Sequence, residues 1–194
     1  MNFGNIHDFE YKEKMEVEYK DKNPDYKDIC HKDKHKEIIF ECGIRPADAF
    51  FEIDDGKVKP GQEFVLDRLR IDVSCLKKPV VKIEFSSLIV FEAEDEHGAE
   101  HEVEVSLLFK LIRISKGEKE VVQSWKYLYE IDVENNIDEL EVEMSVPFTV
   151  TFCDRPTSAA YEYVMVVEGI DFEGEFDALR VVKPDLSAIA QGQC

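Results

Sequence analysis

The sequence has little glycine, little proline and no long apolar run, and each of these shortages excludes a class of protein. Only nine glycines and seven prolines occur among 194 residues. No Gly-x-Gly-x-x-Gly, Gly-x-x-x-x-Gly-Lys or Gly-x-Ser-x-Gly motif is present, so the phosphate loops of nucleotide-binding proteins and the serine elbow of hydrolases are missing. No apolar run approaches the roughly 20 residues that span a bilayer, so we expect no insertion into a membrane.

Basic residues are too few for a protein that binds nucleic acid. The chain has 24 Lys and Arg against 43 Asp and Glu, which gives a net charge of -19 and a pI near 4.6. Such a surface repels a phosphate backbone, so we expect no nucleic-acid partner. Hydrophobic residues make up 44% of the chain, which is too many for a disordered protein. The length suits one folded domain with a tail.

The cysteines do not indicate a disulfide-stabilised scaffold. There are five, at Cys30, Cys42, Cys75, Cys153 and Cys194, and no two form a Cys-x-x-Cys pair. The N-terminus lacks the basic-then-apolar layout of a signal peptide. We therefore expect a protein made in the cytoplasm with reduced thiols, which would oxidise only after release by cell lysis.

The composition changes near residue 37. Residues 1–36 hold eight Lys and nine acidic residues, for a net charge of -1, whereas the remaining 158 residues carry -18. Apolar alternation in the first part is confined to residues 15–19, which is too little to offset the entropy of ordering. We predict an N-terminal arm over residues 1–36, flexible unless a partner orders it, and a single domain over residues 37–194.

From residue 37 onward apolar residues recur with a period of two, which predicts strands. Pro147 lies inside one of these runs, which indicates an edge strand or a bend. Residues 94–98 and 115–118 predict turns, the first of them a hairpin between consecutive strands. Asp67 is expected to face water. The predicted strands cover residues 37–42, 49–53, 65–75, 81–91, 103–111, 121–133, 140–152, 161–167 and 175–182, the last ending at Pro184.

Eight or nine strands with one apolar face each need a second layer, and no segment has the helical periodicity to supply it. At most, residues 184–190 are long enough for a single helical turn. The predicted fold is all-β: a two-sheet antiparallel β-sandwich of jelly-roll or other Greek-key type. Periodicity does not fix the order of the strands.

No group of residues indicates a catalytic or metal centre. Cys30, His31, His35 and Cys42 match no standard zinc spacing. The acidic residues at 92–101 lack the ligand order of a calcium loop. We therefore expect a protein that is not an enzyme and that has no cofactor and no metal site.

Trp125, Tyr127 and Tyr129 alternate along one predicted strand. Such a row could stack on a sugar ring, although alternation on a strand is more typical of a core. The row leaves open an alternative function, in which the protein is a ligand-binding β-sandwich module of carbohydrate-binding type with an unspecified small ligand.

Four segments carry a resemblance to a known family. They are Ile-Ile-Phe-Glu-Cys-Gly at 38–43, Cys-Leu-Lys-Lys-Pro-Val-Val-Lys-Ile-Glu-Phe-Ser-Ser at 75–87, Phe-Thr-Val-Thr-Phe-Cys-Asp at 148–154 and Ser-Ala-Ile-Ala-Gln at 187–191. Together they resemble an uncharacterised family of small clostridial proteins known only as a domain of unknown function. More remotely, a jelly roll behind an arm with cysteines resembles the subunits of endospore appendages. That resemblance implies an arm that reaches a neighbouring subunit and oxidises to it after release from the mother cell.

The leading hypothesis is a non-enzymatic structural protein that self-assembles at the spore or cell surface. Its partner would be a second copy of itself, in a homo-oligomer or filament. Cys30 and Cys42 are the candidate cross-linking residues at the arm, with Cys153 and Cys194 as accessible partners, whereas Cys75 lies on the apolar phase of its strand and is expected to be buried. Addition of the arm to an open sheet edge is a second route to assembly.

Overall fold

A computed structural model describes residues 38–95, 100–134, 140–157 and 159–192 of the chain. The chain divides into two units, Met1–Lys34 and His35–Cys194, and all of the described residues belong to the second. The predicted arm therefore lies outside the described residues. Every regular element in the described ranges is a strand. In particular, these ranges hold no helix long and apolar enough to cross a membrane.

The strands form two large antiparallel sheets and one small hairpin. Sheet 1 has the order β1 (Ile38–Cys42), β11 (Glu175–Gln191), β6 (Val80–Asp95), β9 (Leu140–Asp154), and β2 (Ala49–Phe50) also pairs with β11. Sheet 2 has the order β5 (Glu63–Asp72), β10 (Ala160–Glu173), β7 (Glu100–Ser115), β8 (Glu118–Glu134). The hairpin consists of β3 (Ile53–Asp54) and β4 (Lys57–Val58).

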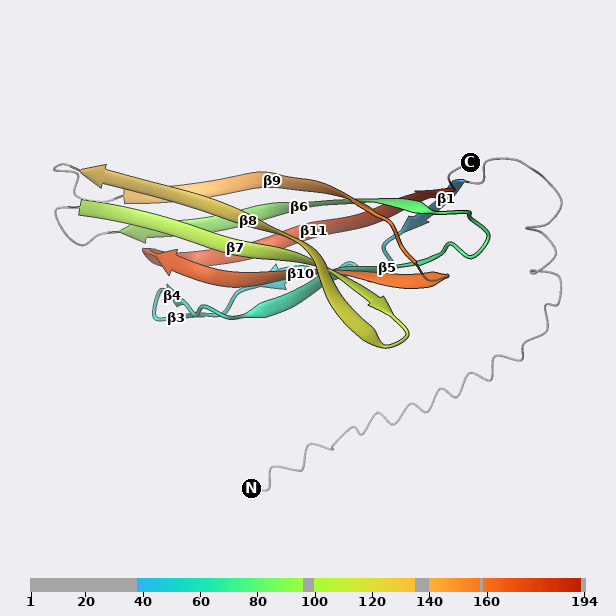
Figure 1. Cartoon of the computed structure of the whole chain (residues 1–194). Helices are drawn as coiled ribbons and strands as arrows, with labels where there is room; N and C mark the ends of the chain where they lie inside the picture. Colours follow the sequence, from blue (N-terminus) through green and yellow to red (C-terminus); the bar gives the residue numbers. More distant parts are fainter. Residues whose placement is uncertain (1–37, 96–99, 135–139, 158, 193–194) are drawn as a thin grey trace, which may run out of the picture. The chain divides into compact units, whose positions relative to one another are not determined.

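The two large sheets lie in two layers, and the chain passes repeatedly from one layer to the other (Figure 1). After β5 in sheet 2 come β6 in sheet 1, β7 and β8 in sheet 2, β9 in sheet 1, β10 in sheet 2 and β11 in sheet 1. This strand order is that of a jelly roll. The predicted all-β, two-sheet antiparallel β-sandwich is confirmed.

The core lies between the two sheets and is filled by the inward-facing residues of the long strands. Phe85 and Phe91 of β6, Phe109 of β7 and Tyr163 of β10 are among its largest fully buried side chains. The Phe85 and Phe109 ring centroids are 6.1 Å apart, which joins the sheets near their centre. Burial of each such side chain stabilises the fold by roughly 1.5–3 kcal/mol, so packing of the two sheets onto each other holds the sandwich together.

The number of strands is higher than predicted. The described ranges contain eleven strands in place of eight or nine, because β2, β3 and β4 have only two residues each and are too short to produce a periodic pattern. The strand predicted over residues 49–53 is divided, with β2 pairing to β11 and β3 pairing to β4.

The prediction that the last strand ends at Pro184, with a helical turn possible after it, is wrong. β11 continues to Gln191 and lies between β1 and β6. Val182 is opposite Leu88 and Asp185 is opposite Ser86, so Lys183 and Pro184 share one position of the ladder as a bulge. A bulge tolerates proline because it leaves a residue without a ladder hydrogen bond.

One predicted turn is wrong and the other is confirmed. β6 and β7 do not pair, because β6 belongs to sheet 1 and β7 to sheet 2, so the connection near residues 94–98 crosses between sheets. In contrast, Lys116 and Gly117 join β7 to β8 in a two-residue hairpin with φ values of 53° and 84°. Both angles suit the type I′ turn that tight hairpins favour.

Candidate functional site: surfaces available for assembly

The outer face of sheet 1 carries an exposed apolar patch close to the start of the described chain. Ile38 and Phe40 of β1 are 65% and 59% exposed, and Ile189 of β11 is 40% exposed. Phe40 is the cross-strand partner of Ile189, so the two side chains lie on the same face. We call Ile38, Phe40 and Ile189 the outer apolar patch. Ile38 and Phe40 are two residues apart on β1 and so share this face, which places three exposed apolar side chains where another molecule could contact them.

Two exposed thiols flank this patch. Cys42 ends β1, two residues after Phe40, and Cys153 lies near the end of β9. Cys153 is opposite Lys82 of β6, and Lys82 is opposite Ile189, so Cys153 lies in the same cross-strand row as Phe40. Cys75 is half-buried in the connection from β5 to β6. Cys30 and Cys194 lie outside the described residues.

Cys42 and Cys153 cannot form a disulfide within one chain. Strands β11 and β6 separate β1 from β9. Adjacent strands are about 4.8 Å apart, which places the two cysteines at least about 14 Å apart across the sheet. A disulfide needs Cα atoms within about 7 Å. Each of these thiols can therefore form a disulfide only with a cysteine from another segment or another copy.

One lateral side of the sandwich is closed by main-chain hydrogen bonds. Between β1 and β2, which both belong to sheet 1, the chain runs across to β5 of sheet 2, and the Gly43 N–H donates to the Leu186 carbonyl of β11 at 2.6 Å. The Ile44 and Ala47 N–H groups donate to carbonyls of β5, both at 2.8 Å. This crossing segment, residues 43–48, joins sheet 1 to sheet 2.

Asp67 of β5 anchors the crossing segment from inside. It is 1% exposed, contrary to the prediction that it faces water, because it shares the inward phase of Leu69 and Ile71. A bulge at Leu66 changes the phase only on the other side of Asp67, where Val65 faces out. Its carboxylate accepts hydrogen bonds from the N–H groups of Arg45 at 3.1 Å and Leu186 at 3.2 Å. A polar residue type favours exposure, and no local pattern reveals the main-chain N–H groups of other segments that Asp67 accepts from, so its role was missed.

Among the described residues, no main-chain hydrogen bonds close the opposite lateral side in this way. There the edge strands are β8 of sheet 2 and β9 of sheet 1, and in the described ranges each pairs with a neighbour on one side only. Apolar side chains from both strands pack on the core but stay half-buried. The β8 members are Val122, Trp125, Tyr127, Tyr129 and Ile131, and the β9 members are Leu140, Met144, Phe148, Val150 and Phe152.

Trp125, Tyr127 and Tyr129 belong to this half-buried row. Tyr129 packs against Phe91 with ring centroids 5.1 Å apart. Burial raises the pKa of Tyr127, and the neighbouring Tyr129 adds to the shift. The three side chains therefore face the interior of the sandwich from an edge strand, with part of each surface still accessible.

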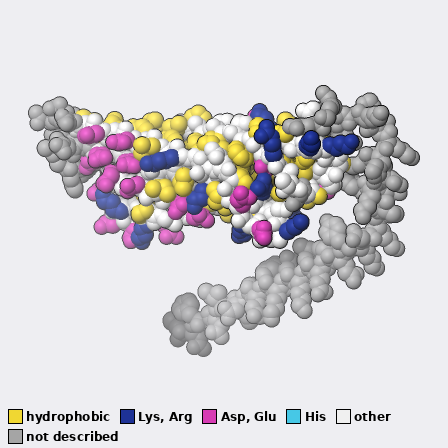
Figure 2. All heavy atoms as spheres, in the orientation of Figure 1, with side chains coloured by type: hydrophobic (Ala, Val, Ile, Leu, Met, Phe, Trp, Pro, Cys, Tyr) yellow, Lys and Arg dark blue, Asp and Glu magenta, His cyan; other side chains and the backbone are white. Residues whose placement is uncertain are grey.

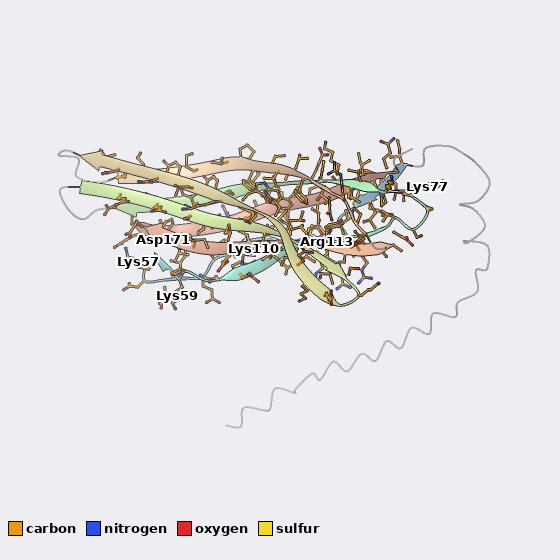
Figure 3. The ribbon with its side chains drawn as sticks, in the orientation of Figure 1. Lys57, Lys59, Lys77, Lys110, Arg113 and Asp171 are labelled. Atoms are coloured by element: carbon orange, nitrogen blue, oxygen red, sulfur yellow. The ribbon has the colours of Figure 1, made fainter. Side chains whose placement is uncertain are left out.

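A buried polar cluster pins one end of the open side. Asp154, the last residue of β9, accepts hydrogen bonds from Arg113 Nη1 on β7 at 2.8 Å and from the Tyr163 hydroxyl on β10 at 2.7 Å. Figure 3 labels Arg113, whose guanidinium also bonds Glu120 on β8 at 2.7 Å. The cluster connects sheet 1 to sheet 2 through charged and hydroxyl groups.

The pKa values in this cluster follow from its surroundings. Burial raises the pKa of Tyr163, and the hydrogen bond to Asp154 raises it further. Burial alone would lower the pKa of Arg113, but hydrogen bonds with Glu120 and Asp154 outweigh it and raise the pKa above its usual value. Arg113 is charged and Tyr163 is neutral over the physiological range, as a structural role requires.

The end of the sandwich where β6 ends and β7 begins is strongly acidic, and Figure 2 shows Asp and Glu side chains crowded there. Asp95, Glu102, Asp132, Glu173 and Glu175 surround an open depression of about 300 Å³. Partial desolvation raises the pKa of Glu102, and Glu173 and Asp132 raise it further. In the described part of the chain, no three His, Cys, Asp or Glu side chains are arranged to hold a metal ion.

The strand order and register define the described residues as an antiparallel jelly-roll β-sandwich. The chain belongs to the family described as "Domain of unknown function (DUF4489)", whose model matches residues 36–191. No curated protein shows significant similarity to it.

Two solved structures show distant likeness to the fold. Infectious bursal disease virus strain Gx is 9% identical with a TM-score of 0.32, over 82% of this chain and 37% of the viral chain. Strain Gt of the same virus is 9% identical with a TM-score of 0.19, over 82% of this chain and 42% of the viral chain. The chain thus spans less than half the length of either viral chain.

Proposed function

We propose that this protein is a non-enzymatic structural protein that self-assembles at the spore or cell surface, using its N-terminal arm and thiol cross-links. The observation that carries the proposal is the pair of exposed cysteines on sheet 1, Cys42 and Cys153, which cannot pair with each other within one chain. They flank the outer apolar patch, which gives a second copy a surface to bind.

In the sequence, residues 1–36 come directly before β1, which carries two residues of the outer apolar patch. Residues 1–36 could extend to about 120 Å when fully stretched, which is enough to reach a neighbouring copy. A contact between an arm and a different surface of the next copy is heterologous, and such contacts form rings or open filaments rather than closed pairs.

The proposed covalent step joins Cys30 or Cys42 of one copy to Cys153 or Cys194 of another. Two thiols lose two protons and two electrons as the sulfur–sulfur bond forms, and dioxygen takes them up as hydrogen peroxide. Such a step suits a protein made in a reducing cytoplasm and exposed to air when the mother cell lyses. The resemblance to endospore appendage subunits supports this order of events.

Negative-stain electron microscopy of the full chain tests the proposal, with one sample kept in air and one kept in reductant. Ordered polymers in air that shorten or dissolve in reductant are expected. Uniform small particles in both samples would contradict self-assembly. Polymers that are equally abundant and stable in reductant would contradict the role of the thiols.

A second experiment isolates the arm. Deletion of residues 1–36 is expected to abolish the polymers and to leave a folded domain with a cooperative unfolding transition. A deletion variant that still forms the same polymers would contradict the role of the arm. The double variant Cys42→Ser, Cys153→Ser tests the thiols separately, with Cys75→Ser as the matched control because Cys75 is only half-exposed.

A further inference from the structure

The free edge of β8 is the longest uninterrupted edge in the described part of the sandwich. β8 pairs with β7 in continuous register from Gln123 to Glu134, with one bulge earlier in the strand. No proline lies in β8. Edge strands of this kind present unpaired N–H and C=O groups that can form a ladder with another chain.

The other edges are shorter or are interrupted. β1 has five residues, and the crossing segment bonds to β5, which also contains the bulge at Leu66. β9 has 15 residues against 17 in β8, and Pro147 lies in its middle. A proline on an edge discourages pairing with a further strand, because it has no N–H to donate.

The sequence of β8 is complementary to itself when two copies run antiparallel around Leu128. On the outer face, Leu128 is 48% exposed and meets Leu128 of the second copy, so two apolar side chains cover each other. In the same register Lys126 is opposite Glu130 of the second copy, and the symmetry produces this opposite-charge pair twice. Directly opposite charges stabilise an antiparallel pair, whereas like charges destabilise it.

The inner face of β8 matches itself in the same register. Tyr127 is opposite Tyr129 of the second copy, and Trp125 is opposite Ile131. All four of these residues are half-buried on β8 and face the core. A second β8 would extend the covered row of side chains across the boundary between the two copies.

The charges around Glu130 provide an independent argument. Glu130 is directly opposite Glu104 of β7, and Glu104 and Glu130 both raise the pKa of the nearby Glu102. Lys126 makes no ion pair within the described residues and is exposed. Pairing of two copies would bring a lysine to each Glu104–Glu130 pair.

We propose that β8 pairs antiparallel with β8 of a second copy, around a two-fold axis at Leu128, to form one continuous eight-stranded sheet from two copies of sheet 2. This inference deepens the proposed function and rests on it, since it names one contact between copies. The contact is isologous and stops at a dimer. Arms and thiols would then link dimers into larger assemblies.

The test uses the full chain in reductant, with sedimentation equilibrium to measure the dissociation constant of the dimer. Glu130→Lys places two lysine pairs across the axis and is expected to weaken the dimer at least tenfold. Lys126→Glu combined with Glu130→Lys restores opposite charges and is expected to recover most of the wild-type affinity. Glu143→Lys on β9, also exposed and also on an edge strand, is the matched control and is expected to leave the dimer unchanged.

A second variant tests the axis itself. Leu128→Cys brings two identical cysteines face to face, so oxidation is expected to link residue 128 of one copy to residue 128 of another, as mapped by mass spectrometry of peptides. Glu143→Cys is expected to give no such symmetric link. The unfolding midpoint of each variant confirms that its fold is intact.

The outcomes separate this inference from the proposed function. A wild-type chain that is monomeric in reductant, or a dimer that Glu130→Lys leaves unchanged and Leu128→Cys fails to link, would overturn the β8 contact. If such a chain still forms polymers in air, the proposed function survives. A β8 dimer that persists after deletion of residues 1–36, without polymers in air from the full chain, would support the contact and contradict the proposed function.

Discussion

Gly43 and Asp67 lie so close together that no other residue fits at position 43 without a shift. A Cβ atom on Gly43 would lie 1.7 Å from Oδ2 of Asp67. This contact is possible because the crossing segment runs directly over the buried carboxylate that accepts its hydrogen bonds. The closed side of the sandwich therefore depends on having glycine at position 43 and aspartate at position 67.

Gly43→Ala is expected to destabilise the fold by about 2–4 kcal/mol, because either the crossing segment or Asp67 must move and buried hydrogen bonds are lost. Urea unfolding measures the change. Gly61→Ala is the control, since nothing lies within 4 Å of its Cβ position and only its φ of +83° is strained. That strain is expected to lower stability by about 1 kcal/mol. Equal losses for the two variants would contradict the close-contact explanation.

Asp154→Ala is expected to destabilise the protein by about 2–4 kcal/mol, because Arg113 and Tyr163 lose their shared acceptor between the sheets. Glu120→Gln removes only the exposed partner of Arg113, and a loss below about 1 kcal/mol is expected. Chemical denaturation of both variants distinguishes the buried carboxylate from the exposed one. A larger effect for Glu120→Gln would contradict the proposed role of Asp154.

Stability is expected to fall as the pH rises above about 10, the usual pKa of tyrosine. The folded protein keeps the Tyr163 proton where the unfolded chain has released it, because burial and Asp154 raise the pKa of Tyr163. The unfolded state then binds fewer protons, so the free energy of unfolding decreases with pH. Tyr163→Phe removes this group, so the free energy of unfolding is expected to fall less steeply between pH 9 and 11, by roughly the contribution of one proton to the slope. Urea titrations at each pH measure the slope. An unchanged slope would contradict the assignment.

Phe40→Ser is expected to reduce polymer formation in air while changing the free energy of unfolding by less than about 0.5 kcal/mol, since an exposed side chain contributes little to the fold. Phe50→Ser is the control because Phe50, on β2 of the same sheet, is 60% exposed but lies outside the outer apolar patch. Electron microscopy and light scattering compare the two variants. Equal polymer yields from the two variants would contradict a role of the outer apolar patch in polymer formation.

Fluorescence of Trp125, the single tryptophan, tests the alternative ligand-binding function. Because the ring is half-buried against the core, emission is expected to be blue-shifted and unchanged by a panel of glycans. A saturable shift with one glycan would favour the ligand-binding module. Greater quenching by acrylamide in Glu130→Lys than in wild type is also expected, since loss of the dimer uncovers β8.

Several features of the fold follow from local sequence alone. Alternation assigns the inner and outer faces of β6, β7 and the part of β8 from Gln123 onward, because a strand directs successive side chains to opposite sides. It is wrong for Val121, which a bulge turns outward. Pro147 indicates an edge strand, and β9 is at the edge of sheet 1 without a bend in its register. The turn at Lys116 and Gly117 follows from its residue types.

Other features follow only from contacts between distant segments. The bulges at Leu66 and Pro184 depend on the strands paired with them, so alternation wrongly turns Val65 inward and ends β11 too early. The hydrogen bonds that keep Asp67 buried also come from other segments. The separation of Cys42 from Cys153 arises from the strands between them, not from their distance along the chain.

The sequence by itself determined that this chain forms a two-layered β-sandwich, because a period of two gives each strand one apolar face that must be buried. The tertiary structure decided which sheet each strand joins, which lateral side is closed and which edge stays open. These depend on hydrogen bonds and packing between residues far apart in the chain, and side-chain alternation, which repeats every two residues, carries no information about them.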